Sequence, residues 1–217
     1  MSVSSVTAPP RPPRPARPDD PVKRLFDVVV ATVLLLLTAP MMAVVAVAVA
    51  VRLGRPVLFR QCRIGRDDRP FELIKFRTMR APDSARGLLT DADRLTPLGR
   101  WLRATSLDEL PTLWCVLKGD MSIVGPRPLL PEYLSRYSPT QARRHEVRPG
   151  ITGLAQVRGR NSLDWDAKFS LDVEYVTSRS LRLDLSILAA TVGTVLRQDG
   201  ISAEGNATMP EFLGSRR

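Results

Sequence analysis

An uncharged apolar run near the start of the chain constrains its fold more than any other feature. From residue 28 to residue 51, 24 consecutive residues carry no charged side chain. A helix rises about 1.5 Å per residue, so the run would reach roughly 36 Å, enough to cross a hydrocarbon core of about 30 Å. It is too long for a signal peptide, starts late and lacks a small-residue cleavage site. We therefore predict a membrane segment over residues 22–53.

The path of this segment depends on Pro40 and on the flanking charges. Pro40 removes a helix hydrogen bond, and Thr38 can satisfy part of the freed backbone. Because basic flanks favour the cytoplasmic side, a straight span would place one set on the wrong side. We favour a re-entrant hairpin bent near Pro40, and a proline-kinked span is the alternative. Both flanks are basic: Arg11, Arg14, Arg17, Lys23 and Arg24 precede the run, and Arg52, Arg55, Arg60 and Arg63 follow it.

The rest of the chain divides into two tails and one domain. Residues 1–21 are rich in proline and arginine and poor in large apolar side chains, so we predict a disordered tail. We predict a small, mostly helical α/β domain over 54–202 and a C-terminal tail over 203–217. Within the domain, two short strands at 57–59 and 71–76 enclose a charged turn, and residues 81–95 are loop-like.

Apolar spacing and capping residues predict five helices in the domain. The first follows Thr96-Pro97, and the second begins at Ser106 and has apolar residues at positions 110, 113, 114 and 117. The last has an apolar side that suits either the core or the membrane surface, where it would be an amphipathic helix. The predicted ranges are 98–103, 106–118, 131–146, 165–178 and 181–197.

Composition narrows the chemistry. The formal net charge is +10, and 28 of the 32 basic residues are arginine, which points to phosphate-bearing partners. The alternative interpretation is that part of the arginine excess comes only from the nucleotide composition of the source genome. Cys62 and Cys115 lack metal-ligand spacing, so we expect no disulfide framework or zinc site and a reducing compartment. His145 is the single histidine, which excludes sites that need several imidazoles, and we treat it as a surface residue.

The adjacent acids Asp108 and Glu109 support two interpretations. Ser106 with Glu109 matches a helix capping box, a structural role. Cations before and after the pair, Lys75, Arg103 and Arg127, instead suggest a site that holds a phosphate together with a divalent metal. A carboxylate can also accept a phosphoryl group covalently. The residues by themselves leave both interpretations open.

Ordered motif blocks connect the chain to a known family. From residue 23 to about 200, some four-fifths of its length, it resembles the bacterial sugar transferases, the monotopic phosphoglycosyl transferases. The blocks begin with Lys23-Arg24-Leu25-Phe26-Asp27, Phe59-Arg60-Gln61, Lys75-Phe76-Arg77-Thr78-Met79 and Thr96-Pro97-Leu98-Gly99-Arg100. They continue with Ser106-Leu107-Asp108-Glu109-Leu110-Pro111, Gly119-Asp120-Met121-Ser122, Val124-Gly125-Pro126-Arg127-Pro128, Arg148-Pro149-Gly150-Ile151-Thr152-Gly153 and Gln156-Val157 with Gly159-Arg160.

The chain departs from the family pattern at few places. Thr112 and Cys115 stand where many relatives carry Gln and Asn, and Thr38-Ala39-Pro40 replaces a frequent Ser-Pro pair. If that Asn contacts substrate, Cys115 alters affinity or specificity; if it only packs, nothing changes. The four spanning helices of longer members are not present before the apolar run, so we expect the minimal form of the family.

The resemblance implies a re-entrant membrane helix broken at Pro40 and a small catalytic domain at the cytoplasmic face of the bacterial inner membrane. It implies that Asp108 attacks the β-phosphorus of a UDP-sugar, releasing UMP and leaving an aspartyl phosphosugar. A polyprenyl phosphate, such as undecaprenyl phosphate, then takes the phosphosugar. This would be the first membrane step in the assembly of an exopolysaccharide, O-antigen, capsule or glycoprotein glycan.

The resemblance also assigns roles within the site. Glu109 would assist the metal or the second substrate, and Asp108 and Glu109 would bind the cofactor Mg²⁺. Lys75, Arg103 and Arg127 match positions expected to hold phosphates, and Arg148 is a weaker candidate for substrate contact. The identity of the sugar depends on loops that we expect near 80–95 and 155–165.

The partners expected are a UDP-sugar, a polyprenyl phosphate and the cytoplasmic membrane, with no nucleic acid; the sequence leaves homo-oligomerisation open. A pI near 10.7 also suits a membrane-tethered nucleic-acid-binding protein. Against it, aromatic residues make up only 6% of the chain and no strand has a base-stacking pattern. A third alternative is a scaffold subunit with an inactive site, which the intact set of acids and cations disfavours.

Overall fold

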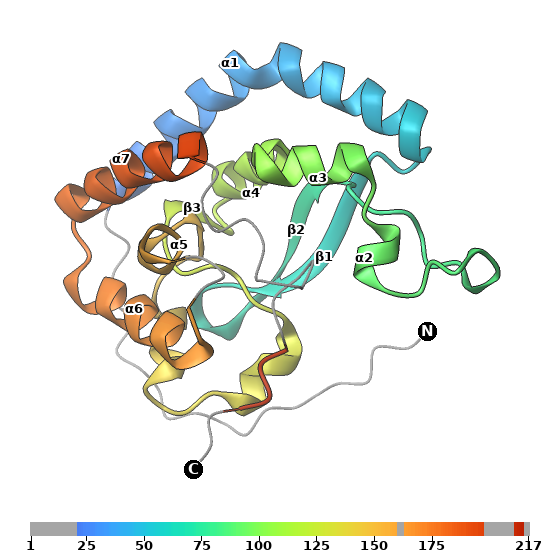
Figure 1. The fold of residues 1–217 in the computed structure, drawn as a ribbon. Coiled ribbons are helices and arrows are strands. Elements are labelled where there is room, and N and C mark those ends of the chain that lie inside the picture. The colour runs from blue at the N-terminus through green and yellow to red at the C-terminus, as the bar shows by residue number, and fades with distance from the viewer. Residues whose placement is uncertain (1–20, 160–162, 198–210, 215–217) are drawn as a thin grey trace.

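The structure is a computed structural model that describes residues 21–159, 163–197 and 211–214. It is mostly helical, with two small sheets (Figure 1). The strands are β1 (Leu58–Ile64), β2 (Pro70–Phe76), β3 (Ser122–Val124) and β4 (Gly150–Thr152). The α-helices are α1 (Pro21–Leu53), α2 (Asp91–Arg94), α3 (Pro97–Ala104), α4 (Leu113–Lys118), α5 (Leu154–Arg158), α6 (Trp165–Ser178) and α7 (Leu181–Arg197). The 3-10 helices are η1 (Arg66–Asp68), η2 (Ser84–Arg86), η3 (Leu107–Thr112), η4 (Pro131–Arg136) and η5 (Gln141–Glu146).

Helix α1 coincides with the predicted membrane segment and arches over the domain (Figure 1). Within the described residues, it is the one helix long and apolar enough to cross a membrane. It is buried near both ends, at Ala31 in its first half and at Val49 in its second. Its middle faces outward, with Leu36 and Leu37 71% and 73% exposed. The helix therefore rests on the domain at its two ends and presents its apolar middle to the surroundings.

Polar contacts hold both ends of α1. At the first end, Arg24 donates to the carbonyl oxygens of Val116 and Leu117 at 2.7 and 2.8 Å. Nearby, the buried carboxylate of Asp27 accepts hydrogen bonds from the start of β3. At the other end, Arg77 donates to the Gly54 carbonyl at 2.5 Å. These contacts connect α1 to α4, β3 and the end of β2.

Helix α1 continues through Pro40, so the predicted separation into two helices is not seen. Pro40 has no N–H to offer the carbonyl of Leu36, which favours a bend at this turn. Thr38 donates its hydroxyl to the carbonyl of Leu34 at 2.7 Å, a bond that also bends helices. We predicted that Thr38 would help satisfy the backbone group freed by Pro40, but its partner lies earlier in the helix.

The hairpin of β1 and β2 is longer than predicted and supports the short helices behind it. It is antiparallel and pairs Leu58 with Phe76 at one end and Ile64 with Pro70 at the other. Thr112 donates to the Ile74 carbonyl at 2.9 Å, and the Cys115 thiol lies 3.4 Å from the Glu72 carbonyl. Both side chains that depart from the family pattern are thus buried against β2, where they pack.

Three of the five predicted helices are confirmed. Helix α3 begins after Thr96, whose hydroxyl accepts from the Gly99 amide, and α6 and α7 cover their predicted ranges. The helix predicted over 131–146 is wrong, because η4 and η5 occupy this range and residues 137–140 separate them. Ser138 precedes Pro139, and the residue before a proline disfavours the α conformation. The loop-like stretch 81–95 contains η2 and α2.

The predicted helix from Ser106 divides into η3 and α4, and its capping box is wrong. Ser106 has φ 57° in the left-handed region, and its side chain makes no capping bond. Trp114, predicted on the apolar face, is 54% exposed, whereas Cys115 and Val116 are fully buried. The tighter 3-10 winding of η3 shifts the buried face, and it frees Glu109 from a capping role.

Two further expectations change. His145 is not a surface residue: it is 4% exposed, and its Nδ1 lies 2.5 Å from an Asp68 carboxylate oxygen. Residues 211–214, within the predicted tail, pack against the domain through the buried ring of Phe212. The tail 1–21 lies outside the described residues except for Pro21. Cys62 and Cys115 are both free cysteines.

Candidate active site

Three separate elements bring charged side chains together around Glu109. Lys75 lies near the end of β2, Glu109 in η3, and Arg127 in the turn after β3. Lys75 Nζ lies 2.5 Å and Arg127 Nη2 2.8 Å from the same oxygen, Oε1 of Glu109. Glu109 is therefore held by two cations at once, and both of their hydrogen bonds go to the same oxygen.

Close backbone packing fixes the turn that carries Arg127. A Cβ at Gly125 would lie 2.4 Å from the Arg148 carbonyl oxygen, and one at Gly150 would lie 2.0 Å from the Gly125 amide nitrogen. Only glycine allows the turn and β4 to approach so closely. The Gly125 amide donates to the Thr152 carbonyl at 2.9 Å. The turn is thereby held to the end of β4.

Asp108 is next to Glu109 in the sequence, but its pKa is shifted in the opposite direction. It is 7% exposed, and within residues 21–159, 163–197 and 211–214 no group donates a hydrogen bond to its carboxylate. Burial and the neighbouring charge of Glu109 raise the pKa of Asp108 to about 6, against the opposing pull of Lys75, Arg103 and Arg127. Asp108 remains mostly ionised at neutral pH, and neither of its carboxylate oxygens accepts a hydrogen bond from the described residues.

The pKa of Glu109 is shifted the other way. Burial would raise the pKa of Glu109, but the charges of Arg127 and Lys75 and their hydrogen bonds outweigh burial and lower it. Burial lowers the pKa of Lys75, and the Glu109 charge opposes that effect. The Arg127 side chain is 49% exposed, so solvent screens its part of the interaction. Glu109 is thus ionised at neutral pH and belongs to a cluster of ion pairs with Lys75 and Arg127.

The other predicted residues are divided between two places. Arg103 joins the cluster: its Nε donates to the Thr78 hydroxyl at 3.1 Å, and its charge acts on Asp108. Arg148 does not join the cluster, because its Nε donates to the Gly119 carbonyl at 2.8 Å. It lines a separate small pocket at the first end of α1, beside Arg24.

Arg63 also belongs to the cluster. From the sequence it was named only as a basic residue after the apolar run and was not predicted as a site residue. The β1–β2 register pairs Phe59 with Lys75 and Arg63 with Phe71, so Arg63 and Lys75 share one face of the hairpin. Burial and the charge of Arg127 lower the pKa of Arg63 to about 10. Alternate residues of a strand share a face, so Phe59, Gln61 and Arg63 could be grouped from the sequence. The pairing of β1 with β2, which puts Arg63 on the same face as Lys75, could not be predicted.

The charge balance of the cluster favours an anionic ligand. Arg63, Lys75, Arg103 and Arg127 are four cations around the two acids Asp108 and Glu109. Burial together with the Arg127 charge also lowers the pKa of Lys168, to about 8. The Arg127 charge thus lowers the pKa of each neighbouring cation, and cations gathered in this way are stabilised by a bound phosphate.

Comparison with known proteins identifies the family. Residues 18–198 match the bacterial sugar transferases. The chain belongs to that family. It is 50% identical to an uncharacterized sugar transferase, EpsL, of Bacillus subtilis (strain 168), over 89% of this chain and 96% of that one. It is 43% identical to a UDP-glucose:undecaprenyl-phosphate glucose-1-phosphate transferase of Caulobacter vibrioides, over 82% of this chain and 70% of the relative.

Longer relatives share the same region. This sugar transferase is 39% identical to an undecaprenyl-phosphate galactose phosphotransferase of Salmonella typhimurium over 82% of its own length. It covers only 41% of that relative. The shared region includes the whole charged cluster, so the relatives named for transfer to undecaprenyl phosphate have a counterpart of this domain.

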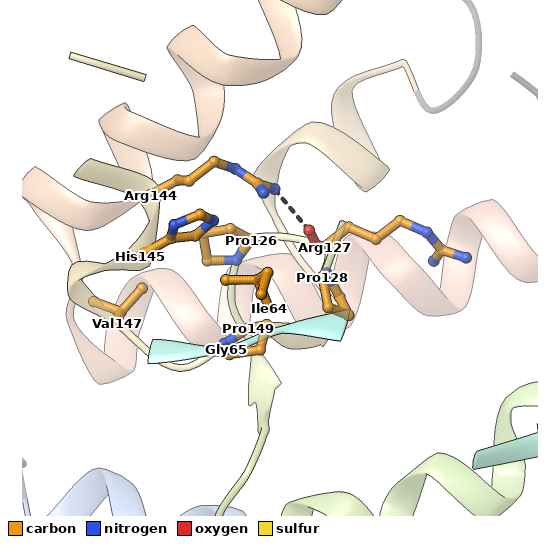
Figure 2. A pocket seen from close by; sticks show the side chains of 9 residues that line it. All are labelled: Ile64, Gly65, Pro126, Arg127, Pro128, Arg144, His145, Val147 and Pro149. Carbon is orange, nitrogen blue, oxygen red and sulfur yellow. Dashed lines mark hydrogen bonds between the residues drawn. The ribbon is translucent and has the colours of Figure 1, made fainter. Parts of the chain in front are cut away.

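A shallow pocket lies behind the turn that carries Arg127 in this sugar transferase (Figure 2). Arg144 reaches across it and donates to the Arg127 carbonyl oxygen at 2.6 Å. The Arg127 side chain points away from the other lining residues, toward the cluster. Asp108 does not line this pocket, so the pocket supports the turn rather than forming the reaction site.

Proposed function

We propose that this chain transfers a sugar-1-phosphate from a UDP-sugar to a polyprenyl phosphate, with undecaprenyl phosphate as the acceptor. The products are UMP and a polyprenyl diphosphate sugar. The relatives named for this reaction support the substrate class. One observation supports the mechanism above all: two adjacent acids differ, because Glu109 is held by Lys75 and Arg127 while Asp108 is buried and accepts no hydrogen bond from the described residues.

The proposed reaction has two displacements on phosphorus. In the first, an oxygen of the Asp108 carboxylate bonds to the β-phosphorus of the UDP-sugar, and the bond from that phosphorus to the bridging oxygen breaks. The bridging oxygen leaves with the electron pair as part of UMP. In the second, an oxygen of the lipid phosphate bonds to the same phosphorus, and the Asp108 oxygen leaves as a carboxylate. The enzyme ends unchanged, and no proton is needed from Asp108.

The cations perform the binding in this scheme. Asp108 and both substrates are negative, so attack requires the negative charge on the diphosphate to be balanced. Arg127, Lys75 and Arg103 would contact phosphate oxygens, and Arg63 would add positive charge to the same site. Glu109 keeps Lys75 and Arg127 next to each other before substrate arrives, which pre-organises the anion site.

Mg²⁺ is the cofactor that we propose, and the residues fit it. Mg²⁺ is usually bound by one or two carboxylates together with substrate phosphates and water. The Asp108 carboxylate and Oε2 of Glu109 offer such ligands, although the described residues contain no group of three or more metal-binding side chains. A bound Mg²⁺ would neutralise charge on the diphosphate.

We propose that α1 is a re-entrant membrane helix at the cytoplasmic face of the inner membrane. Both of its ends are fixed to the same domain, and its exposed middle is apolar. Helices α3, α4 and α7 lie next to α1 (Figure 1). They also expose large apolar side chains, as expected for amphipathic helices at a membrane surface. These side chains are Trp101 on α3, Trp114 on α4, and Leu185 and Val192 on α7. This arrangement would place Asp108 near a lipid phosphate.

The reaction is tested with the purified full chain, Mg²⁺, undecaprenyl phosphate and a panel of UDP-sugars, by measuring UMP release. Intact-mass analysis without the lipid acceptor should detect a phosphosugar adduct. The Asp108→Asn variant should give neither UMP nor adduct and should retain its fold by circular dichroism. Normal turnover by Asp108→Asn would refute the covalent mechanism. No UMP from any UDP-sugar would refute the proposed reaction.

A further inference from the structure

A buried ion pair stands directly behind Arg127. Arg144, from η5, is 3% exposed, and Asp172, from α6, is 4% exposed. Arg144 Nε and Nη2 lie 2.9 and 2.8 Å from Oδ2 of Asp172. The same Nη2 donates to the Arg127 carbonyl at 2.6 Å (Figure 2). The Arg144 guanidinium therefore supports the Arg127 backbone through a hydrogen bond of its own, in addition to the glycine packing against β4.

Two aromatic rings confine that guanidinium. Its central carbon lies 5.8 Å from the ring centre of Tyr137 and 5.5 Å from that of Phe169, both cation–π distances. The Tyr137 hydroxyl is 3.4 Å from Nη1 of Arg144. A residue that fixes these two rings fixes Arg144, and through it the turn that carries Arg127.

The end of the chain supplies such a residue. Phe212 is 2% exposed and packs edge-on against Phe169 at 4.9 Å and stacked against Tyr137 at 5.8 Å between ring centres. Tyr133 and Trp165 complete the cage around it, at 5.7 and 5.5 Å. One aromatic side chain from beyond α7 thus contacts both rings that confine Arg144.

Residues 211–214, the C-terminal strap, are also held through their backbone. Arg136 binds the Glu211 carboxylate at 2.6 Å and donates to the Phe212 carbonyl. The Phe212 amide donates to the Tyr133 hydroxyl at 3.3 Å. Leu213, the next residue, is 81% exposed. The strap is therefore anchored by Phe212 and Arg136.

We propose that the C-terminal strap positions Arg127 for phosphate binding, because Phe212 closes the aromatic cage that holds Arg144 against the Arg127 backbone. This inference rests on the proposed transfer from a UDP-sugar. Phe212 is a positioning residue, since it touches neither the charged cluster nor the phosphate that the cluster would hold. The line of contacts runs from Phe212 through Tyr137 and Phe169 to Arg144, then to Arg127 and Glu109.

A double-mutant cycle tests the inference in the full-length protein, with kcat and KM measured by UMP release at varied UDP-sugar. Phe212→Ala should lower kcat/KM for the UDP-sugar about tenfold or more, since a displacement of about 1 Å at a binding group can cost about a hundredfold. Because the strap acts through Arg127, the Arg127→Ala and Phe212→Ala/Arg127→Ala chains should agree within about twofold. Multiplying effects, expected of a general loss of stability, would overturn the inference.

Two further variants sharpen the cycle. Leu213→Ala removes an exposed apolar side chain from the same strap and should leave kcat/KM within about twofold of wild type. Arg136→Ala removes the Arg136 hydrogen bonds to the strap and leaves the Phe212 ring in place. This variant is used in place of Phe212→Ala if the Phe212→Ala protein does not fold. It should lower kcat/KM in the same direction. Wild-type activity in Phe212→Ala, or in Arg136→Ala when it stands in, would overturn the inference.

A measurement without catalysis separates this inference from the proposed reaction. Hydrogen–deuterium exchange of peptides covering residues 126–147 should rise in Phe212→Ala and stay unchanged in Leu213→Ala. If the wild type released no UMP, the reaction would be wrong, and the exchange result would still decide whether the strap fixes the turn. Unchanged exchange in Phe212→Ala would show that it does not.

Discussion

Replacing Asp108 with Asn should make the protein more stable at neutral pH. The pKa of Asp108 is raised from 3.8 to about 6, so the folded chain holds this proton more tightly than the unfolded chain does. Ionising Asp108 therefore costs folding free energy as pH rises through this interval. A difference of about two pKa units corresponds to about 3 kcal/mol at pH 7, and the side chain is only 7% exposed. Asn approximates the neutral carboxyl group and avoids this cost.

The pH dependence of the stability gain distinguishes a burial cost of the Asp108 charge from other effects of the substitution. The stability gain of Asp108→Asn should be about 3 kcal/mol at pH 7, roughly half of that at pH 5 and close to zero below pH 4. In a chain of this length, about 3 kcal/mol corresponds to a melting temperature higher by roughly 6–12 °C. Thermal unfolding in detergent, followed by tryptophan fluorescence at several pH values, measures it. An Asn variant no more stable than wild type at pH 7 would refute the assigned burial cost.

Glu109→Gln is the matched control, one residue away, and its effect should have the opposite sign. The pKa of Glu109 is lowered, so its charge contributes stability above its ordinary pKa of 4.5, and that stability is lost as pH falls. The Gln variant should melt below wild type at pH 7, and the gap should narrow in acid. Equal changes in melting temperature in the two variants would mean that the pKa values of Asp108 and Glu109 are not shifted in opposite directions.

Other predictions concern the reaction and the membrane helix. With UMP release as the assay, kcat/KM for the UDP-sugar should fall tenfold per pH unit below about 6, because Asp108 becomes protonated and loses its nucleophilic form; a flat profile down to pH 5 would contradict this. Lys75→Ala should leave Glu109 with one cation and lower kcat/KM by about tenfold or more, and Lys75→Arg should restore part of it. In a Cys62→Ser background, cysteines at Val22 and Arg52 should both react with an impermeant thiol reagent from the cytoplasmic side; labelling from opposite sides would refute the hairpin.

The sequence was sufficient for features set by local pattern. The bounds of α1, α6 and α7 follow from apolar runs and helical spacing, and α3 from a Thr-Pro start. The pattern failed at Ser106, where a left-handed backbone replaced the expected cap, and between η4 and η5, where a proline divides the helix. Both failures occur where the backbone leaves regular helical geometry, which composition does not record.

The site was predictable as a set of residues and not as an arrangement. Lys75, Asp108, Glu109 and Arg127 could be named from their types and order. Their electrostatic roles could not be predicted, because those roles depend on which of the two acids contacts the cations. The contacts join residues far apart in the sequence: Glu109 is 34 residues from Lys75 and 18 residues from Arg127. Arg148 was a weaker candidate for substrate contact by resemblance, and in the structure its Nε donates to a carbonyl at the end of α4.

The membrane helix and the charged cluster are connected through β3. Asp27, in the first turns of α1, accepts from the Ser122 hydroxyl and the Ile123 amide, both at 3.0 Å. The same strand leads directly into the turn that carries Arg127, which Arg144 holds from behind. Arg127, which we propose contacts the phosphate, is thus connected on one side to the first end of α1 and on the other to the domain interior. If the bilayer holds α1 at a fixed depth, as we propose, the same contacts would also hold Arg127 at a fixed depth and bring Asp108 to the level of a lipid phosphate.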